Sequence, residues 1–307
     1  MEIIAINPSI RVASETFATV GFFDGVHQGH RYLIDLLKEK ARDEGLKTAV
    51  ITFPIHPRKV LQQYYQPKAL NTFDERMNHL ASTGIDYCYL MEFTKAFSEI
   101  PAQDFIQKIL SEQLNVKFLL VGYDHRFGKG RENVFEHYAA YGQACGMTVL
   151  SAPQWSETEG HTSSTVIRNL LAEGKVKTAA KKLSYYYTLE GEVVHGNHLG
   201  RTIGFPTANI DLNDKDKLIP CEGVYAVRIG LQNESYSGMA YIGKRPTVTN
   251  QGELRLEVNI FDFDRDIYGE QLRVELLAFI RSDIRFDGLD ELKHQLAEDK
   301  IQCVQNI

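Results

Sequence analysis

The sequence predicts two domains: an α/β domain built on a parallel sheet, followed by an antiparallel β-barrel that one helix closes. Three observations predict this arrangement. The chain has 307 residues, which exceeds the usual size of one domain. Short apolar runs alternate with amphipathic stretches over residues 17–150, and short strands separated by Gly, Asn and Asp turns follow over residues 188–280. We expect the domains to span residues 1–184 and 185–307.

The first half alternates predicted strands with predicted helices. The strands are expected in FATVGFF, KTAVITF, YCYLMEF, KFLLVG and TVLS, and the helices over residues 29–44, 73–83, 102–114 and 134–145. Gly84 and Gly146 stand where helix C-caps belong. This βαβα alternation is typical of a parallel sheet wrapped by helices, whose ligands bind beyond the carboxyl ends of the strands.

The second half changes to a strand-and-turn pattern after one more helical stretch, which ends near Gly174. The strands are expected in TLEGEVV, GVYAVRIG, YSGMAYIG, LRLEVNIF and LRVELLAFI. A closing helix is expected over residues 289–297, with Leu292 and Leu296 on one face. The pattern predicts an antiparallel barrel.

Composition excludes several classes of protein. The formal net charge of -6 argues against a general nucleic-acid binder, which needs a basic face. The four cysteines contain no C-x-x-C pair, so they predict neither a zinc site nor a disulfide framework. No secretion signal and no run of about 18 apolar residues is present, and we expect a cytoplasmic protein without a membrane partner.

The strongest chemical signal is the segment GFFDGVHQGH, where the first predicted strand passes into the first helix. His27 and His30 are three residues apart and project from one side of a helical turn. The helix start adds unpaired N–H groups, and Gly29 lets a phosphate approach the backbone. We expect a triphosphate-binding turn. A helix cap is the simpler alternative, and a zinc site lacks a third ligand.

A second anion site is expected at Thr162-Ser163-Ser164-Thr165-Val166-Ile167-Arg168. Hydroxyl groups at a helix start, followed by an arginine on the first turn, suit phosphate binding. The alternative is an ordinary N-cap with a solvated arginine. The GYDHRFGKG segment is not a P-loop, because its glycines are one residue too far apart and Gly130 replaces Ser or Thr.

The second domain carries its chemistry in the stretch GNHLGRTIGFPTAN. Its three glycines at intervals of four residues allow a loop to fold closely over phosphates, while Thr207 and Asn209 offer oxygen ligands for Mg²⁺. A merely tight connection is the alternative. Glu257 lies on the polar face of LRLEVNIF, where a solvated carboxylate is the simpler interpretation.

The segments GFFDGVHQGH, SSTVIR and GYDHRFGKGR resemble the adenylyltransferase half of bacterial bifunctional riboflavin kinase/FMN adenylyltransferases, also called FAD synthetases. The H-x-G-H element alone is shared by many nucleotidyltransferases, so it leaves the acceptor open. The resemblance implies a Rossmann-like nucleotidyltransferase domain. It also implies flavin-side contacts from the loop that holds Gly122, Asp124, Phe127 and Gly128.

The second domain resembles the riboflavin kinase half of the same family, through GNHLGRTIGFPTAN, GVYAV, IGKRPT, LEVNIFDF and IYG in that order. The P-T-A-N element is specific to that family. The resemblance implies that Thr207 and Asn209 contact Mg–ATP, that Glu257 is the general base, and that Arg281 and Phe286 lie on the flavin side.

The candidate site residues fall into four roles. The catalytic residues are His27, His30, Arg168 and Glu257. The ATP-binding residues are Gly21, Phe23, Asp24, Gly25, Gly29, Ser163, Ser164, Thr165, Gly200, Gly204 and Pro206. The flavin-binding residues are Phe53, His56, Asp124, Phe127, Arg281 and Phe286, and the metal ligands are Thr207 and Asn209.

The chain departs from the family pattern at three places. The family usually has T-F-E-P-H-P after the second strand, whereas this chain has T-F-P-I-H-P, without the glutamate. His125 stands where an aromatic residue is common, and Tyr241 where the family often has asparagine. The first two changes bear on the FMN pocket rather than on the class of reaction.

The resemblance implies a two-step synthesis of flavin cofactors. Riboflavin and ATP would give FMN and ADP, and FMN and ATP would then give FAD and pyrophosphate, with Mg²⁺ as cofactor. Two alternatives stay open. The first domain could act on another phosphorylated acceptor, or the chain could be a flavin-binding regulator without turnover.

Overall fold

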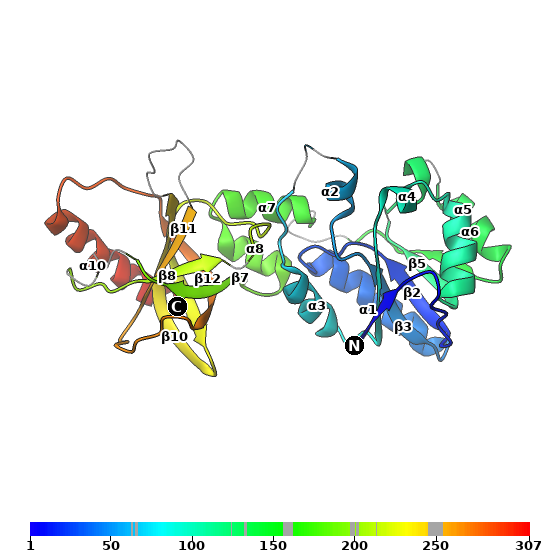
Figure 1. Cartoon of the computed structure of the whole chain (residues 1–307), viewed down its shortest axis with the longest axis horizontal. Helices are drawn as coiled ribbons and strands as arrows, with labels where there is room; N and C mark the ends of the chain where they lie inside the picture. The colour runs from blue at the N-terminus through cyan, green and yellow to red at the C-terminus, as the bar shows by residue number, and fades with distance from the viewer. Residues whose placement is uncertain are drawn as a thin grey trace. The chain divides into compact units, whose positions relative to one another are not determined.

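The computed structural model describes residues 1–62, 64, 67–123, 125–131, 134–155, 162–196, 200, 203–212, 214–244 and 254–307. The chain divides into two compact units, Met1–Ser163 and Ser164–Ile307 (Figure 1). The helices α7 (Ser164–Ala172) and α8 (Val176–Leu183) group with the second unit, although the sequence pattern assigns them to the first domain. The sequence-based boundary after residue 184 stays a prediction.

The first unit is built on a six-stranded parallel sheet with the order β1-β4-β3-β2-β5-β6. The strands are β1 (Glu2–Ile6), β2 (Thr16–Val20), β3 (Lys47–Thr52), β4 (Tyr87–Met91), β5 (Val116–Val121) and β6 (Thr148–Ser151). Five of them match the predicted strands. The edge strand β1 was not predicted.

Helical segments connect these strands. They are α1 (Gln28–Asp43), α2 (Pro57–Leu61), α3 (Phe73–Ala81), α4 (Lys95–Ser98), α5 (Ala102–Asp104), the π-helix η1 (Phe105–Gln113), the 3₁₀ turn η2 (Lys129–Arg131) and α6 (Phe135–Gln143). Gly84 and Gly146, which follow α3 and α6, have φ of +79° and +75°. Both therefore have the left-handed backbone expected at a helix C-cap.

Helices cover both faces of this sheet, because successive strand residues enter different cores. On β3, Ala49 and Ile51 pack into the core that contains η1 and α6, whereas Val50 packs into the core that contains α3. Strands that are apolar on both faces are typical of a parallel sheet between two helical layers. The predicted α/β architecture is confirmed.

The strand order reverses between β2 and β5. From β2 the chain moves through β3 and β4 toward one edge, whereas β5 and β6 extend toward the other edge. Loops that leave two such strands diverge and open a crevice beyond their carboxyl ends, where ligands of α/β proteins bind. The segment GFFDGVHQGH follows β2, and the segment GYDHRFGKG follows β5.

The second unit contains a closed antiparallel barrel with the order β10-β11-β8-β7-β12-β9. Its strands are β7 (Tyr187–Val194), β8 (Ala208–Leu212), β9 (Gly223–Leu231), β10 (Glu234–Lys244), β11 (Leu254–Ile260) and β12 (Gln271–Arg281). The helix α10 (Leu289–Asn306) packs on the barrel through Leu296 and Cys303. The predicted barrel and closing helix are confirmed, and the helix is longer than expected.

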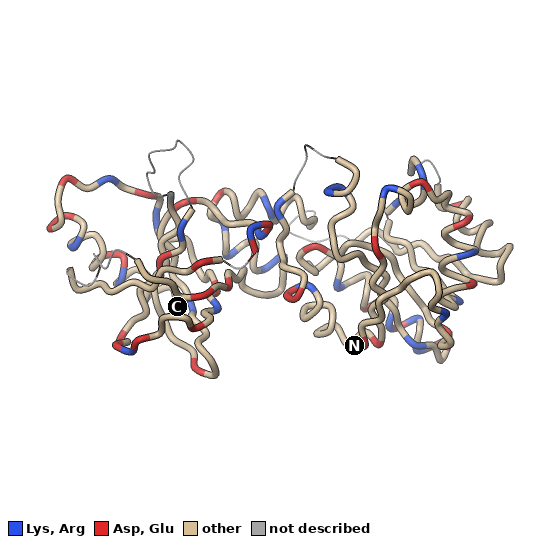
Figure 2. The backbone as a smooth tube through the Cα atoms, viewed as in Figure 1, with Lys and Arg blue, Asp and Glu red and all other residues tan. Residues whose placement is uncertain are grey.

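None of the helices in the described ranges is long and apolar enough to cross a membrane. Acidic and basic residues are interspersed along the described backbone of both units (Figure 2). The predicted absence of a nucleic-acid partner stays a prediction.

Candidate active sites

The turn after β2 brings the two predicted catalytic histidines together. His27 is the N-cap of α1, and its side chain accepts a hydrogen bond from the backbone N–H of His30 at 3.4 Å. The two imidazole rings stack with centroids 3.7 Å apart and planes 15° apart. Left-handed backbone at Phe23, Gly25 and Val26 winds the turn tightly enough to place both rings at the helix start. The first residues of α1 therefore present N–H groups beside an imidazole pair.

His30 is held in its neutral form. Burial lowers its pKa well below 6.5, and the neighbouring His27 and His125 lower the pKa further. Its buried Nδ1 has no hydrogen-bond partner in the described part of the chain. A phosphate anion beside this ring would favour its protonated form. This part of the turn is therefore suited to an anionic ligand.

Asp24 and Gly29, two predicted ATP-binding residues, contribute to the shape of this turn. The Asp24 carboxylate accepts hydrogen bonds from the backbone N–H groups of Leu70 and Asn71, at 3.0 and 3.4 Å. A Cβ at Gly29 would lie 3.3 Å from the imidazole of His27, so glycine leaves that ring in place. The other predicted residues of this segment, Gly21, Phe23 and Gly25, lie in the same turn.

The predicted flavin residues Phe53 and Phe127 belong to one chain of aromatic rings. Phe53 contacts Phe97 with ring centroids 5.8 Å apart, Phe97 contacts Phe105 at 5.7 Å, and Phe105 contacts Phe127 at 5.4 Å. Phe127 also stacks on Tyr138 at 4.2 Å. The segments after β3 and β5 are therefore joined by apolar packing on one side of the sheet.

His56 lies in the segment after β3, and Gly128 lies in the segment after β5. The imidazole of His56 caps α2 by accepting from the N–H of Arg58 at 3.1 Å, and it meets the Phe22 ring edge-on with centroids 4.5 Å apart. Gly128 has φ +84°, and a Cβ there would lie 2.6 Å from that of Ala102. Asp124, another predicted flavin residue, lies outside the described residues.

The segment predicted to bind an anion, residues 162–168, contains the point in the sequence where the first unit ends. Ser163 is the last residue of the first unit, and Ser164 begins α7 in the second. Thr165 and Arg168 lie on the first two turns of α7, where Thr165 is exposed and Arg168 is half-buried. Their role in ATP binding stays a prediction.

In the barrel, strand register brings Glu257 and Asn209 together. Glu257 on β11 is paired with Asn209 on β8, and on its other side with Tyr241 on β10. A Cβ at Gly196 would lie 2.0 Å from the Asn209 amide nitrogen, so this glycine leaves the space that the amide occupies. Side chains directly opposite on neighbouring strands lie close enough to interact. The predicted base and the predicted metal ligand therefore lie beside each other.

The loop before β8 is shaped by backbone contacts. Gly200 accepts a hydrogen bond from the N–H of Phe205 at 2.8 Å, and a Cβ at Gly200 would lie 2.2 Å from the carbonyl oxygen of Phe205. Gly204 has φ +84°. Pro206 and Thr207 follow as exposed residues just before β8. The tight turn and the exposed threonine are compatible with the predicted phosphate and metal contacts.

Sequence reasoning overlooked Asn259 as a residue of this site. Its buried amide donates a hydrogen bond to the Pro206 carbonyl oxygen at 2.6 Å, which ties the loop before β8 to β11. The alternation of LRLEVNIF placed Asn259 on the same face as Glu257, and this was the available signal. The partner is a backbone atom, which no side-chain pattern reveals.

Tyr241 shares the surroundings of Glu257. Burial raises the pKa of Tyr241 to about 12, helped by Asp283, Glu222 and Glu257. A Cβ at Gly243, two residues along β10, would lie 2.2 Å from the Tyr241 hydroxyl. The side chain of Tyr241, which stands where the family often has asparagine, therefore lies along its own strand over Gly243.

Arg281 and Phe286 lie together beside α10. The Arg281 guanidinium donates to both carboxylate oxygens of Asp299, at 2.8 and 2.7 Å, and lies 5.8 Å from the Phe286 ring centroid. Asp299 is fully buried. Its bidentate pair with Arg281 thus links β12 to α10, and the predicted flavin contact of Arg281 stays a prediction.

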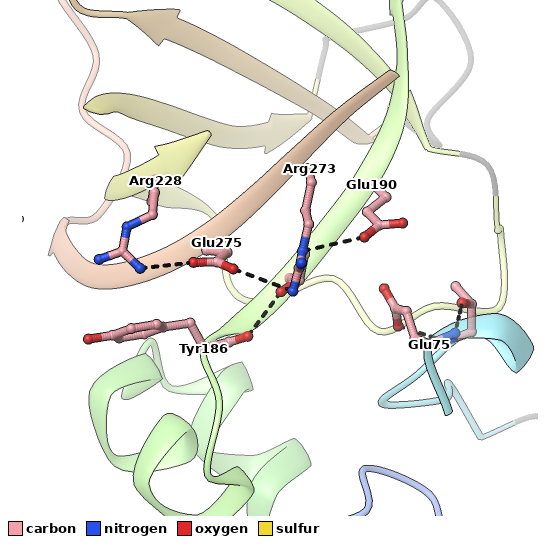
Figure 3. Close-up of polar contacts among 8 residues, drawn as sticks. Glu75, Tyr186, Glu190, Arg228, Arg273 and Glu275 are labelled. Atoms are coloured by element: carbon pink, nitrogen blue, oxygen red, sulfur yellow. Dashed lines mark hydrogen bonds and ion pairs between the residues drawn. The ribbon is translucent and has the colours of Figure 1, made fainter. Parts of the chain in front are cut away.

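The barrel wall also carries a chain of three ion pairs, two of them between strands and one within β12. Arg228 pairs with Glu275 at 3.2 Å, Glu275 with Arg273 at 3.4 Å, and Arg273 with Glu190 at 3.6 Å (Figure 3). Partly exposed pairs of this kind contribute little individually to stability. Because they join β9, β12 and β7, they support the strand pairing of the barrel.

Comparison with known proteins assigns each half of the chain to the family that its motifs resemble. The family model described as FAD synthetase matches residues 9–166, and the one described as riboflavin kinase matches residues 183–307. Bifunctional riboflavin kinase/FMN adenylyltransferase from Escherichia coli (strain K12) is 40% identical over 92% of this chain and 90% of its own length. This chain belongs to that family. The Bacillus subtilis (strain 168) relative is 34% identical over 95% of this chain and 92% of its own length.

A solved structure from Streptococcus pneumoniae, described as a macrolide-efflux protein, has the same fold. It matches with a TM-score of 0.89 and 35% identity over 97% of both chains. The similarity covers both units, including the segments that carry the two candidate sites. The family assignment confirms the resemblance on which the predicted chemistry rests.

Proposed function

We propose that this chain makes FAD in two steps, with the first unit adenylylating FMN and the barrel phosphorylating riboflavin. The two activities follow from the family to which the chain belongs. The roles of the kinase residues are supported mainly by the pairing of Glu257 on β11 with Asn209 on β8. A carboxylate beside an amide ligand at the edge of a glycine-rich loop suits transfer of a phosphoryl group from ATP to a hydroxyl.

In the kinase step, Glu257 accepts the proton of the riboflavin 5′-hydroxyl. The hydroxyl oxygen forms a bond to the γ-phosphorus of ATP while the bond from that phosphorus to the β-phosphate oxygen breaks, and ADP leaves. Protein groups contribute mainly by positioning the two reactants and by stabilising charge. Asn259, through its bond to the Pro206 carbonyl oxygen, holds the loop that would carry the ATP phosphates.

In the adenylyl transfer step, an oxygen of the FMN phosphate attacks the α-phosphorus of ATP, and pyrophosphate leaves. The FMN phosphate is already ionised at neutral pH, so no protein nucleophile is required. His27 and His30 would stabilise charge on the ATP phosphates together with the N–H groups at the start of α1. Arg168 is proposed to act on the same phosphates.

The donor set around Asn209 fits Mg²⁺. Thr207 is an exposed residue, and its hydroxyl and the amide oxygen of Asn209 are hard oxygen donors. Because Gly196 has no Cβ, the Asn209 amide has room beside it. When bound, Mg²⁺ neutralises phosphate charge. We further propose that the chain uses Mg²⁺, that it is cytoplasmic and that it has no nucleic-acid partner.

The two half-reactions can be tested separately. The purified chain is given riboflavin and ATP, or FMN and ATP, each with Mg²⁺ or with EDTA, and the products are separated by chromatography. We expect ADP and FMN from the first mixture, pyrophosphate and FAD from the second, and neither with EDTA. A folded protein that converts neither flavin would refute the proposed function.

A further inference from the structure

Arg76 on α3 is a buried arginine beneath the first candidate site. Only 1% of the residue is exposed, although arginine is among the residues least often buried in proteins. Burial lowers its pKa to about 10, and the nearby Asp24 opposes this shift. The guanidinium therefore stays charged at neutral pH in surroundings that disfavour charge. A purely apolar residue would fill this position without that desolvation cost.

The guanidinium binds backbone carbonyls from two different loops. It donates to the Phe22 carbonyl oxygen at 2.8 Å, in the turn after β2, and it lies 4.0 Å from the Phe22 ring centroid. It also donates to the carbonyl oxygens of Phe53 at 2.6 Å and Pro54 at 3.3 Å, in the segment after β3. One side chain thus ties together the chain segments that leave two neighbouring parallel strands.

These two loops carry the two halves of the candidate adenylyltransferase site. Phe22 leads directly into the turn with His27 and His30, and the segment after Phe53 carries His56. The Thr52 hydroxyl donates to the same Phe22 carbonyl oxygen at 3.3 Å. The link made by Arg76 is therefore located at the point where the nucleotide side and the flavin side of the site separate.

The helix that carries Arg76 is itself fixed at its start. Thr72 and Glu75 form a capping box, in which the Thr72 N–H donates to Glu75 at 2.9 Å and the Glu75 N–H donates to Thr72 at 3.2 Å (Figure 3 labels Glu75). Asp24, in the nucleotide-side turn, accepts from Leu70 and Asn71 just before this cap. The segment just before α3 is thus bound to the same turn that Arg76 reaches.

We propose that Arg76 is a positioning residue for adenylyl transfer, holding the nucleotide-side turn and the flavin-side segment at the spacing that brings the FMN phosphate in line with ATP. The inference rests on the proposed function of the first unit. Arg76 touches no reacting atom in this account. It acts through the carbonyls of Phe22, Phe53 and Pro54. A displacement of either loop by about 1 Å would reduce the rate of a two-substrate reaction strongly.

The test compares Arg76→Met, Arg76→Lys and the core substitution Leu37→Ala in the full chain. Leu37 on α1 is fully buried, and its core cluster with Phe17 and Leu120 contains no residue of either loop. Initial rates of FAD formation are measured against FMN and against ATP, and riboflavin phosphorylation in the same preparation serves as an internal control. All rates are scaled to the folded fraction from thermal unfolding.

For Arg76→Met we expect kcat/KM for FAD formation to fall by about tenfold or more, with an increased KM for FMN and an unchanged kinase rate. Arg76→Lys should recover part of the loss, because one ammonium group can reach some of the carbonyls. Leu37→Ala should lower stability and leave both KM values unchanged. If all three variants lose FAD formation only in proportion to the unfolded fraction, Arg76 is structural and the inference is overturned. A wild-type chain without adenylyltransferase activity would instead refute the proposed function.

Discussion

Glu257 on β11 lies directly opposite Asn209 on β8, in a barrel whose register is fixed by closure of all six strands. The pairing predicts the effect of Glu257→Gln. This variant keeps the shape of the side chain and removes the base, so FMN formation from riboflavin should fall by about 100-fold or more. FAD formation from added FMN should be unchanged. Loss of both activities in a folded variant would contradict the separation of the two sites.

A second prediction concerns the glycine that packs against Asn209. Gly196→Ala would place a Cβ 2.0 Å from the Asn209 amide nitrogen, so the amide must move. We expect a reduced kinase rate and an increased KM for Mg–ATP, with unchanged adenylyl transfer. Gly230→Ala is the matched control, because a Cβ there would make only ordinary contact, at 3.6 Å from the Cβ of Arg273. Equal kinase kinetics in the two variants would show that Asn209 does not hold the nucleotide.

The buried imidazole of His30 predicts a pH dependence of stability. Its pKa is lowered in the folded chain, mainly by burial, so the unfolded chain binds the proton more readily. Above about pH 6.5 the ring is neutral in both the folded and the unfolded chain, so burial of His30 adds no pH dependence. As the pH falls below about 6.5, the unfolded chain takes up a proton that the folded chain does not, and the free energy of unfolding decreases. Acidification from pH 7.5 to 5.5 should therefore reduce the melting temperature more in the wild type than in His30→Gln.

The control for that experiment is His294→Gln on α10, where the side chain is 80% exposed. This control variant should lose as much stability on acidification as the wild type. If His30→Gln also behaves like the wild type, the His30 imidazole is not held neutral by burial. The same His30→Gln protein should accumulate FMN from riboflavin, and undiminished FAD output would exclude a role for His30 in adenylyl transfer.

The buried pair of Arg281 and Asp299 predicts a stability effect. Asp299→Ala removes the carboxylate and leaves the guanidinium of Arg281, which is 16% exposed, without this partner. We expect the free energy of unfolding of the barrel to fall by about 3 kcal/mol, measured by denaturant titration. Glu234→Ala removes the partner of Arg265 in an exposed pair, and it should cause little change. A similarly small change for Asp299→Ala would show that α10 is held mainly by its apolar contacts.

Much of the fold could be predicted because its signals are local. The alternation of apolar runs and amphipathic stretches predicted five parallel strands and their helices, and the Gly and Asp turns predicted the barrel. The edge strand β1 was missed although Ile3, Ile4, Ala5 and Ile6 form a short apolar run. Its pairing with β4 is a long-range contact that the local pattern does not show. The pairing of Glu257 with Asn209 follows from barrel register, which the order of strands in the sequence does not specify.

The least predictable parts of the sites are contacts between side chains and backbone atoms. Arg76 binds the carbonyl oxygens of Phe22, Phe53 and Pro54, and Asn259 binds that of Pro206. Every residue has a carbonyl group, so a sequence pattern gives no sign of which one is used. For Arg76 the available signal was a charged residue at a position that the helical periodicity of α3 places in the core. For Asn259 it was a place on the same strand face as Glu257.

The proposed function requires one chain to carry out both steps of FAD synthesis. The most direct measurement is a time course in which the wild-type chain receives riboflavin, ATP and Mg²⁺, and riboflavin, FMN and FAD are quantified together. We expect riboflavin to fall, FMN to rise first, and FAD to follow with release of pyrophosphate. Riboflavin that remains unconverted by a folded protein, or FMN that accumulates without FAD, would contradict the two-step synthesis.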